Sequence, residues 1–528
     1  IEESEEWQVV DMDIHYLPSD ILVGFSIETK GTIEIRNSYY SALVEDGLLR
    51  NVELALSTTT FKKESFILHN IDLIRTQVLG SDEPIAKHFR MYVVDNGRTL
   101  DAEAISSDRI TVFPNVNVGG SGGFAYGMVK ALEARDVTNV LLMDDDVEVS
   151  PESIKRTYRL LTIVNDEYAE AFISGSMMNY DEPDIHWEDI GYITSLGFYR
   201  AVKPVYRMSV LHDCVSCETF DPEVGPWKDL KQRYAAWWYC CIPMSVIKRK
   251  GMPLPLFVRF DDAEYGMRCK PKFMALNGIC VWHLAFFMRY NAAVERYQTT
   301  RNGLIGQAIT GVAPLTNFMT EIKHSVLIEL IKFNYDDAEL LCEGLEDFLK
   351  GPAYFSQKGM AEKLFMDANK HKEKLLSLKE IQKTAKKELG MDLSKIDADR
   401  ICRDFPLGYT PHGKAYNIYH TQLLERALNG QLYGNLKPFE GDTAVVEAVG
   451  WSYQPGKLYG VQNVIAINVQ AKKGIIRHKD AKRARQIWYR FKHDVRVYER
   501  EKPRLEAEYR AIRERVTSVE FWKDYLDV

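Results

Sequence analysis

The sequence has little cysteine, no long apolar run and no excess of basic residues. Its 528 residues include eight cysteines, which are too few and too scattered for a disulfide scaffold. The longest apolar runs, such as residues 140–143, are far shorter than the roughly 20 residues of a membrane-spanning helix. The first residues lack the basic start and apolar core of a signal peptide, and they also lack Met, so we expect a trimmed N-terminus.

The charge balance is slightly acidic, with 67 Lys and Arg against 75 Asp and Glu and a net charge of −8. Proteins that bind nucleic acids usually carry a strong basic excess, so we expect no nucleic-acid partner. A hydrophobic fraction of 46% with 27% charged residues is typical of a globular protein. The length predicts about two to four domains, and no repeat period is found.

Cys214 and Cys217 form a C-x-x-C pair that permits two interpretations. A zinc site needs further ligands at a recognisable spacing, and no second pair lies nearby in the sequence. We therefore favour reduced, buried or half-buried thiols in a reducing compartment.

The hydrophobic pattern predicts an α/β protein with three domains, 1–52, 53–314 and 315–528. The first domain alternates polar and apolar residues, as at 33–36, which predicts an N-terminal β domain of sandwich or barrel type. The second alternates strands with helices, which predicts a mainly parallel sheet that binds ligands beyond the carboxyl ends of its strands. Its strands are predicted at 52–58, 90–94, 110–113, 139–143 and 171–174. The third is mainly helical, with a loop-rich stretch at 401–470.

Asp144, Asp145 and Asp146 follow directly after an apolar strand. Adjacent carboxylates repel one another, and a divalent cation shared by Asp144 and Asp146 removes that repulsion. The alternative is a solvated acidic loop. The position at a strand end favours the metal site.

The glycine-rich stretch 117–125 follows a strand and opens a helix, so its backbone amides are candidates to face an anion. It also contains G-x-G-x-x-A with an acidic residue about 20 positions further on, the pattern of dinucleotide-binding proteins. Two points count against that alternative. First, the motif follows the third predicted strand of the unit, whereas the dinucleotide-binding motif follows the first. Second, three acidic residues follow it, whereas binding one ribose requires a single carboxylate.

Three further features are candidates for chemistry or binding. Asp261 and Asp262 are flanked by aromatic residues, as suits a partly desolvated general base, although a helix start with first-turn acids explains them as well. His283 after an apolar stretch is either a core residue or a metal ligand. Adjacent Trp237 and Trp238 on a strand point to opposite faces, so one is free to line a cleft where sugar rings stack.

Together these motifs resemble the inverting family 2 glycosyltransferases of the GT-A fold, and most narrowly the bacterial galactofuranosyltransferases. The resemblance covers roughly the middle half of the chain. It is carried by N-V-G-G-S-G-G-F at 117–124, L-M-D-D-D-V at 142–147, W-W at 237–238, P-L-P-L-F-V-R-F-D-D-A-E-Y-G at 253–266 and V-W-H at 281–283.

The resemblance implies a role for each matching residue. Asp144, Asp146 and His283 would hold Mn²⁺ or Mg²⁺, and Asp262 would be the catalytic base. The donor would be bound by Thr60, Phe61, Lys63, Asn96, Asn117, Asp145 and Asp261. The acceptor would be bound by Trp237, Trp238 and Phe286. Two positions depart from the family pattern, since Phe286 stands where a Trp is frequent and Lys63 where an Arg is frequent.

The implied activity is transfer of galactofuranose from UDP-galactofuranose to a glycan or glycolipid acceptor in bacterial surface-polysaccharide synthesis. We expect a cytoplasmic homo-oligomer that lies peripherally on the plasma membrane. The alternatives are a family 2 transferase for another UDP-sugar and a non-catalytic glycan-binding or assembly protein.

Residues 471–500 carry 11 Lys and Arg against 3 Asp and Glu, with apolar residues on one helical face. Such a helix either packs on its domain with a solvated basic face or is attracted to an anionic membrane.

Overall fold

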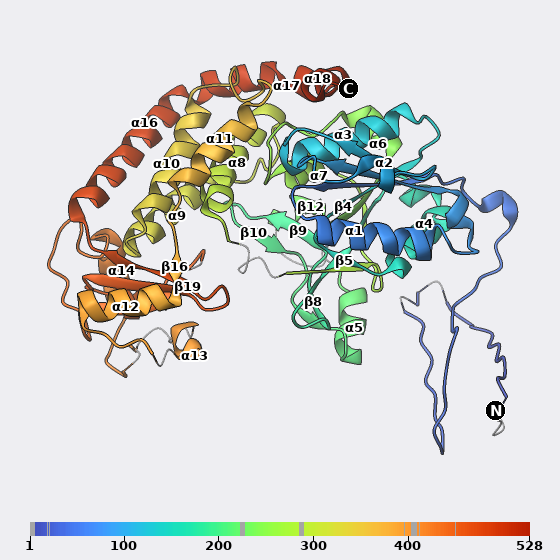
Figure 1. The fold of residues 1–528 in the computed structure, drawn as a ribbon, viewed down its shortest axis with the longest axis horizontal. Helices are drawn as coiled ribbons and strands as arrows, with labels where there is room; N and C mark the ends of the chain where they lie inside the picture. Colours follow the sequence, from blue (N-terminus) through green and yellow to red (C-terminus); the bar gives the residue numbers. More distant parts are fainter. Residues whose placement is uncertain are drawn as a thin grey trace.

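The computed structural model describes residues 6–17, 19–20, 22–221, 228–284, 290–394, 397–402, 409–410, 412–448 and 450–528. Figure 1 shows two lobes side by side, an α/β lobe (blue to green) and a C-terminal lobe (yellow to red). A long helix runs along the second lobe and returns the end of the chain to the first.

The α/β lobe is built on a seven-stranded sheet with the order β14-β6-β13-β4-β1-β2-β3. Its strands are β1 (Leu54–Thr60), β2 (Phe89–Asp95), β3 (Ile110–Pro114), β4 (Asn139–Asp144), β6 (Phe172–Ser174), β13 (Tyr239–Pro243) and β14 (Phe273–Met274). Strands β1 to β4 are parallel, and β13 runs antiparallel between β4 and β6. The five predicted strands and the mainly parallel sheet are confirmed.

The register of the parallel strands brings their carboxyl ends to one edge. Thr60 at the end of β1 lies opposite Asp95 of β2, and Thr59 lies opposite Asp144 of β4. Both faces of the sheet are covered, because Leu54 and Leu56 belong to one apolar core and Ala55 to a second. The helices of this lobe are α1 (Glu64–Leu73), α2 (Ala102–Ile105), α3 (Gly119–Glu133), α4 (Pro151–Ile163), α5 (Leu211–Glu218), α6 (Met244–Lys250) and α7 (Asp261–Cys269).

Two smaller sheets lie at the carboxyl edge of the main one. A five-stranded sheet has the order β11-β8-β7-β15-β5, and a three-stranded sheet has the order β10-β9-β12. Their strands are β5 (Glu148–Val149), β7 (Ser176–Asn179), β8 (Ile185–Glu188), β9 (Ile190–Ile193), β10 (Tyr199–Ala201), β11 (Tyr206–Arg207), β12 (Arg233–Ala235) and β15 (Cys280–His283).

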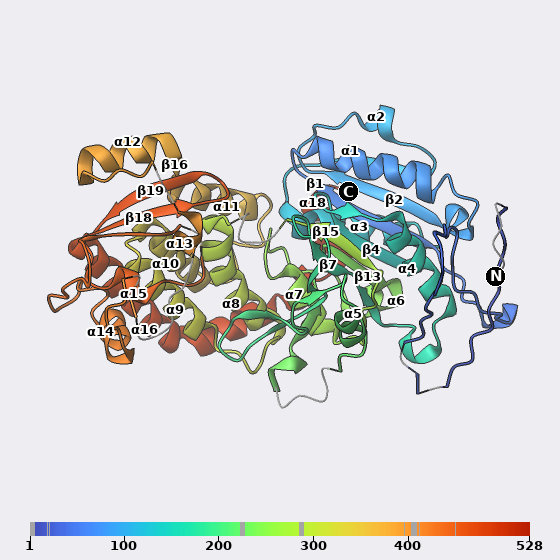
Figure 2. The ribbon, with the colours of Figure 1, turned by 90° about the horizontal axis from the view of Figure 1, so that it is seen from below.

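The C-terminal lobe combines a helical body with a four-stranded sheet of order β16-β19-β18-β17 (Figure 2). Its helices are α8 (Thr299–Thr310), α9 (Phe318–Ile331), α10 (Tyr335–Leu349), α11 (Met360–His371), α12 (Leu378–Leu389), α13 (Ala398–Cys402), α14 (Ile418–Arg426), α15 (Pro455–Leu458), α16 (Ala481–Ala511), α17 (Arg513–Val516) and α18 (Val519–Leu526). Its strands are β16 (Leu376–Ser377), β17 (Thr443–Glu447), β18 (Asn463–Asn468) and β19 (Lys473–His478). The mainly helical character is confirmed, although β17 and β18 lie in the stretch expected to be loop-rich.

The predicted N-terminal β domain is wrong for the residues that the structure describes. Between residues 6 and 52 the described chain forms one short 3₁₀ helix, Asp46–Leu48, and no strand. Ile33 and Ile35 are about half exposed, so these alternating apolar side chains do not pack into a core. An extended segment without partner strands or a buried face gains too little to form a sheet. Figure 1 shows this stretch running away from the α/β lobe.

The basic helix α16 packs on its own lobe. Its apolar side, which includes Ile487, Trp488 and Phe491, is buried, and the helix lies against α8 and α10. Arg490 forms an ion pair with Glu346 of α10. The apolar face is thus covered by protein. None of the described helices has both the length and the apolar character required to cross a bilayer.

The last helix, α18, packs on the α/β lobe. Trp522 is fully buried in the apolar core that includes α3, and its indole N–H donates to the carbonyl of Pro253 at 2.9 Å. This contact ties the end of the chain to the segment that precedes Asp261 and Asp262.

Candidate active site

Asp144, Asp146 and His283 form a group that can hold a metal ion. Asp144 ends β4, Asp146 follows in the next turn, and His283 ends β15. Their ligand atoms all lie within 4.8 Å of one another. The structure therefore brings together the three residues that the sequence analysis named as metal ligands.

Two details fit this group to a divalent cation. The Nδ1 atom of His283 lies 2.6 Å from the carbonyl oxygen of Leu284, which accepts only, so Nδ1 carries the proton. The other ring nitrogen, Nε2, then presents its lone pair 3.8 Å from Asp146 Oδ1. Two carboxylates with one neutral imidazole suit Mn²⁺ or Mg²⁺, which prefer oxygen-rich ligand sets.

Lys63 balances the charge of this acidic turn. Its Nζ lies 2.5 Å from Asp146 Oδ2 and 3.4 Å from Asp145 Oδ1. Burial raises the pKa of Asp145, and the Lys63 charge opposes that rise. The amide of Asn70 donates to the carbonyls of Asp145 and Val147, which fixes the path of the turn.

The expected nucleoside-binding residues gather along the carboxyl edge of β1, β2 and β3. The side-chain amide of Asn96 donates to Thr59 Oγ1 at 3.1 Å and to the carbonyl of Gly119 at 3.0 Å. Asn117 accepts from the backbone N–H of Gly119 at 3.2 Å. Thr60 is buried at the end of β1, whereas Phe61 after it is 43% exposed. The structure thus places Thr60, Phe61, Lys63, Asn96 and Asn117 at one edge, while their roles stay predictions.

Close packing explains the glycines of α3. A Cβ atom at Gly123 would lie 2.0 Å from Thr59 Oγ1, and one at Gly127 would lie 1.8 Å from Ser57 Oγ. Only glycine lets α3 approach β1 so closely. The backbone N–H of Ser121 donates to the carbonyl of Phe257, so this first-turn amide is not open to an anion.

The turn before Asp261 has an unusual backbone. Phe257, Arg259 and Phe260 all have positive φ, at 75°, 72° and 70°. Such conformations are costly for residues with side chains, and they persist only where the surroundings impose them. Here Asn302 of α8 imposes them, since its amide donates to the carbonyls of Leu256, Val258 and Arg259.

Asp261 and Asp262 open α7 at the end of this turn. Phe260 occupies the N-cap, so the two acids are first-turn residues and not caps. Burial raises the pKa of both carboxyl groups, and the neighbouring Asp262 helps to raise that of Asp261 to about 8. The Arg259 charge and a 2.7 Å hydrogen bond from the backbone N–H of Ala263 favour the charged form of Asp262. The positive charge of Arg259 opposes the rise at Asp262, so Asp261 binds a proton more readily than Asp262 does.

The acidic pair and the metal-capable group lie at the same edge. The Asp144 charge contributes to the raised pKa of Asp261, so the two carboxylates interact electrostatically. A Cβ atom at Gly120 would lie 3.9 Å from Asp261 Oδ2, so the start of α3 borders the pair.

Glu188 was not among the site residues predicted from the sequence. Burial, together with the charges of Asp189 and Asp262, raises the pKa of Glu188 to about 8. The charge of Arg259, which forms an ion pair with Glu295, opposes this rise in the pKa of Glu188. The run His186-Trp187-Glu188-Asp189 was a visible group of titratable residues, but nothing in the sequence showed that it meets Asp262.

The two tryptophans expected at the acceptor are both buried. Trp237 packs edge-on against Phe124 and Tyr265, and the indole N–H of Trp238 donates to the carbonyl of Gly175 at 2.9 Å. They belong to different apolar cores, as adjacent residues on opposite faces do. Phe286 lies outside the described residues. The acceptor roles stay predictions.

Comparison with curated proteins finds relatives of known name. The chain is 29% identical over 293 residues to galactofuranosyltransferase GlfT2 of Mycolicibacterium smegmatis, covering 53% of this chain and 43% of the relative. It is 29% identical over 264 residues to GlfT2 of Mycobacterium tuberculosis, covering 48% and 40%. The chain is related to GlfT2. The resemblance inferred from the motifs is thereby confirmed, although the match spans less than half the length of these relatives.

Other comparisons add little. No family model matches the chain. Residues 1–349 of S. aureus TarS match with 11% identity and a TM-score of 0.32, covering 60% of this chain and 79% of that one. The mannosyltransferase PcManGT from Pyrobaculum calidifontis, in complex with GDP-Man and Mn²⁺, matches with 10% identity and a TM-score of 0.31, with the same coverage. With TM-scores this low, the two structures carry no argument.

Proposed function

We propose that this protein is an inverting, divalent-metal-dependent galactofuranosyltransferase that uses UDP-galactofuranose. One observation carries the proposal: Asp144, Asp146 and His283 share a sheet edge with the acidic pair Asp261 and Asp262, in a chain related to GlfT2. A cation site for a leaving diphosphate and a desolvated base for an attacking hydroxyl are the two requirements of direct glycosyl transfer.

The metal-capable group serves the leaving nucleotide. Asp144, Asp146 and His283 Nε2 would hold the ion, and Lys63 would lie beside it. Bound Mn²⁺ or Mg²⁺ supplies positive charge that stabilises a leaving diphosphate. Thr60, Phe61, Asn96 and Asn117 would orient the nucleoside along the sheet edge, while Asp145 and Asp261 would contact the donor.

Asp262 acts as the general base. It takes the proton of the acceptor hydroxyl while that oxygen forms a bond to the anomeric carbon. The bond to the diphosphate oxygen breaks at the same time, and its electron pair leaves with UDP. Attack from the face opposite the leaving group inverts the configuration in one displacement, as in the direct displacement of inverting glycosidases.

The acceptor in this proposal is a lipid-linked glycan. Trp237, Trp238 and Phe286 would line its site, and the basic residues of α16 that face solvent would meet an anionic membrane surface. Because the apolar face of α16 is buried, such an attraction depends on charge alone. We further propose that the protein is a cytoplasmic homo-oligomer peripheral to that membrane.

A donor panel tests the proposal. The protein is incubated with Mn²⁺ and, in turn, UDP-galactofuranose, UDP-galactopyranose and UDP-glucose, and UDP release is followed with and without a galactofuranosyl acceptor. We expect acceptor-dependent release from UDP-galactofuranose, abolished by a chelator, and an inverted anomeric centre by NMR. Turnover of another UDP-sugar instead would indicate the alternative donor. No turnover of any donor, with retained glycan binding, would indicate a non-catalytic binding protein.

A further inference from the structure

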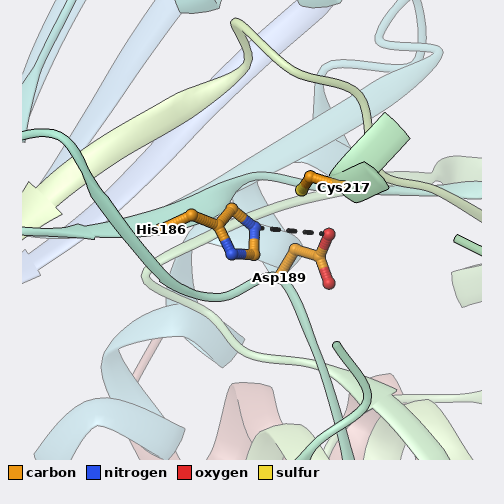
Figure 3. A group of neighbouring side chains, drawn as sticks. All are labelled: His186, Asp189 and Cys217. Atoms are coloured by element: carbon orange, nitrogen blue, oxygen red, sulfur yellow. Dashed lines mark ion pairs between the residues drawn. The ribbon is translucent and has the colours of Figure 1, made fainter. Parts of the chain in front are cut away.

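A second group of metal-ligating side chains lies outside the proposed active site. His186 lies on β8, Asp189 follows that strand, and Cys217 lies on α5. Their ligand atoms all lie within 4.8 Å of one another, and all three residues are buried. Figure 3 shows the imidazole ring of His186 facing the carboxylate of Asp189, with the side chain of Cys217 beside them.

His186 is the least satisfied member of this group. The residue is 1% exposed, and neither ring nitrogen has a hydrogen-bond partner among the described residues. Its Nε2 lies 3.6 Å from Asp189 Oδ2, too far for a hydrogen bond. Burying a polar ring without hydrogen-bond partners is costly, so a ring held only by an ion pair at 3.6 Å points to a further partner that the protein atoms do not provide.

We propose that His186, Asp189 and Cys217 bind a zinc ion. An imidazole, a carboxylate and a thiolate are typical Zn²⁺ ligands, and water completes a tetrahedral set. The C-x-x-C pair lacked partners in the sequence because the two other ligands lie some 30 residues away and meet Cys217 only in the fold. Cys214 takes no part, since its sulfur donates to the carbonyl of Met208.

A cationic group, the ammonium of Lys203, already lies beside two of these ligands. Its Nζ lies 2.6 Å from Asp189 Oδ2 and 3.9 Å from Cys217 Sγ. In the zinc-bound protein the ion replaces the ammonium group as partner of Asp189 and Cys217, and the thiol proton of Cys217 passes to solvent. Zinc and the Lys203 ammonium group therefore compete, and removing the ammonium group strengthens zinc binding.

The site would fix a strand that faces the proposed active site. Glu188 lies between the two ligands His186 and Asp189 and interacts with Asp262. A zinc ion that ties β8 to α5 holds Glu188 beside the acidic pair. The zinc ion itself takes no part in the proposed glycosyl transfer.

Cobalt(II) is the probe that tests the site. The full chain is freed of metal with a chelator and titrated with Co²⁺, and the near-ultraviolet thiolate-to-cobalt charge-transfer band is recorded. We expect one equivalent of Co²⁺ to produce the band and one equivalent of Zn²⁺ to abolish it. The group Asp144–Asp146–His283 contains no thiolate, so cobalt bound there does not produce the band.

Three variants decide which residues form the site. Cys217→Ser should remove the band, whereas the matched variant Cys214→Ser, on the same helix, should keep it. Lys203→Met should keep the band and lower the apparent dissociation constant for Co²⁺ about tenfold, by analogy with other changes next to a metal site. A wild-type chain without the band, or a band lost equally in both cysteine variants, would overturn the proposal. Circular dichroism of each variant shows that it is folded.

Discussion

Two groups of metal-ligating residues each have their histidine on the same five-stranded sheet, and the groups differ in chemistry and access. His283 ends β15 and His186 lies on β8, with only β7 between these strands. The first histidine joins two half-buried aspartates, whereas the second joins a buried aspartate and a buried cysteine. In each group a lysine forms an ion pair with an aspartate, Lys63 with Asp146 and Lys203 with Asp189. The side chain of Lys63 is 35% exposed, whereas that of Lys203 is 8% exposed.

This difference separates a substrate site from a structural site. A group of hard oxygen ligands at the edge of the sheet has room to exchange water for diphosphate oxygens. A buried group with a thiolate holds its ion permanently and ties two elements together. We therefore expect changes in the first group to lower turnover with little effect on stability, and changes in the second to do the reverse.

The largest expected effect comes from Asp262→Asn. An amide cannot take the acceptor proton, so transfer should fall about 10³-fold, the usual size of a general-base contribution. Donor binding should persist, because the metal-capable group is unchanged; titration calorimetry with UDP and Mn²⁺ measures this. The matched variant Asp261→Asn should lose far less, since the raised pKa of Asp261 makes it the less suited of the two to give up its proton and act as base. Equal losses in both variants would contradict the assignment of the base.

Asp146→Asn should lower kcat/KM about 100-fold, because a metal contributes several kcal/mol of charge stabilisation to a leaving group. Its Tm should stay near that of the wild-type chain. Cys217→Ser should lower the Tm of the zinc-loaded protein while turnover stays near the wild-type value. Steady-state kinetics and calorimetry on the two variants test the comparison directly, and the reverse pattern would refute it.

The sequence predicted the parts of the fold that depend on local pattern. Strands β1 to β4 and β6 were found from apolar runs, and the grouping of Asp144, Asp146 and His283 was expected from the family resemblance. The N-terminal β domain was wrong because alternation at Ile33 and Ile35 does not reveal whether a partner strand exists. Strands β17 and β18 were missed because turn residues around them hid short segments.

Contacts between segments that are far apart in the chain could not be predicted from the sequence. Glu188 interacts electrostatically with Asp262, and the ligand atoms of His186 and Cys217 lie close together, because the fold brings β8, α5 and α7 near one another. The positive φ angle of Arg259 likewise depends on Asn302, more than 40 residues later. Periodicity and motif spacing describe residues that are near one another in the chain, so neither predicts these tertiary contacts.

Asn302→Ala tests whether the strained turn serves the proposed active site. The change removes an amide whose two N–H groups are shared among three backbone carbonyls, and it should cost about 2 kcal/mol of stability. Turnover should also fall, because Arg259 and the acidic pair lose their fixed geometry. The matched variant Gln307→Ala, on the same helix, removes two hydrogen bonds to the carbonyls of Ala313 and Thr316. It should destabilise the protein to a similar extent while leaving turnover unchanged; chemical unfolding and kinetics compare the two.

The smallest expected effect is a pH dependence of stability that originates in the acidic pair. The folded chain raises the pKa of Asp261 from 3.8 to about 8, so between these values the folded state binds more protons than the unfolded state. Stability contributed by this group is complete at low pH and is lost as pH rises through the folded-state pKa. Asp261→Asn lacks this titration, so its Tm advantage over the wild-type chain should grow from pH 5 to pH 8. Asp184→Asn provides a control, because a hydrogen bond from Ser209 lowers the pKa of Asp184 from 3.8. This group titrates only at lower pH in both states, so the Tm difference of Asp184→Asn should stay constant from pH 5 to pH 8. A Tm difference of Asp261→Asn that is also constant over this range would mean that folding does not raise the pKa of Asp261.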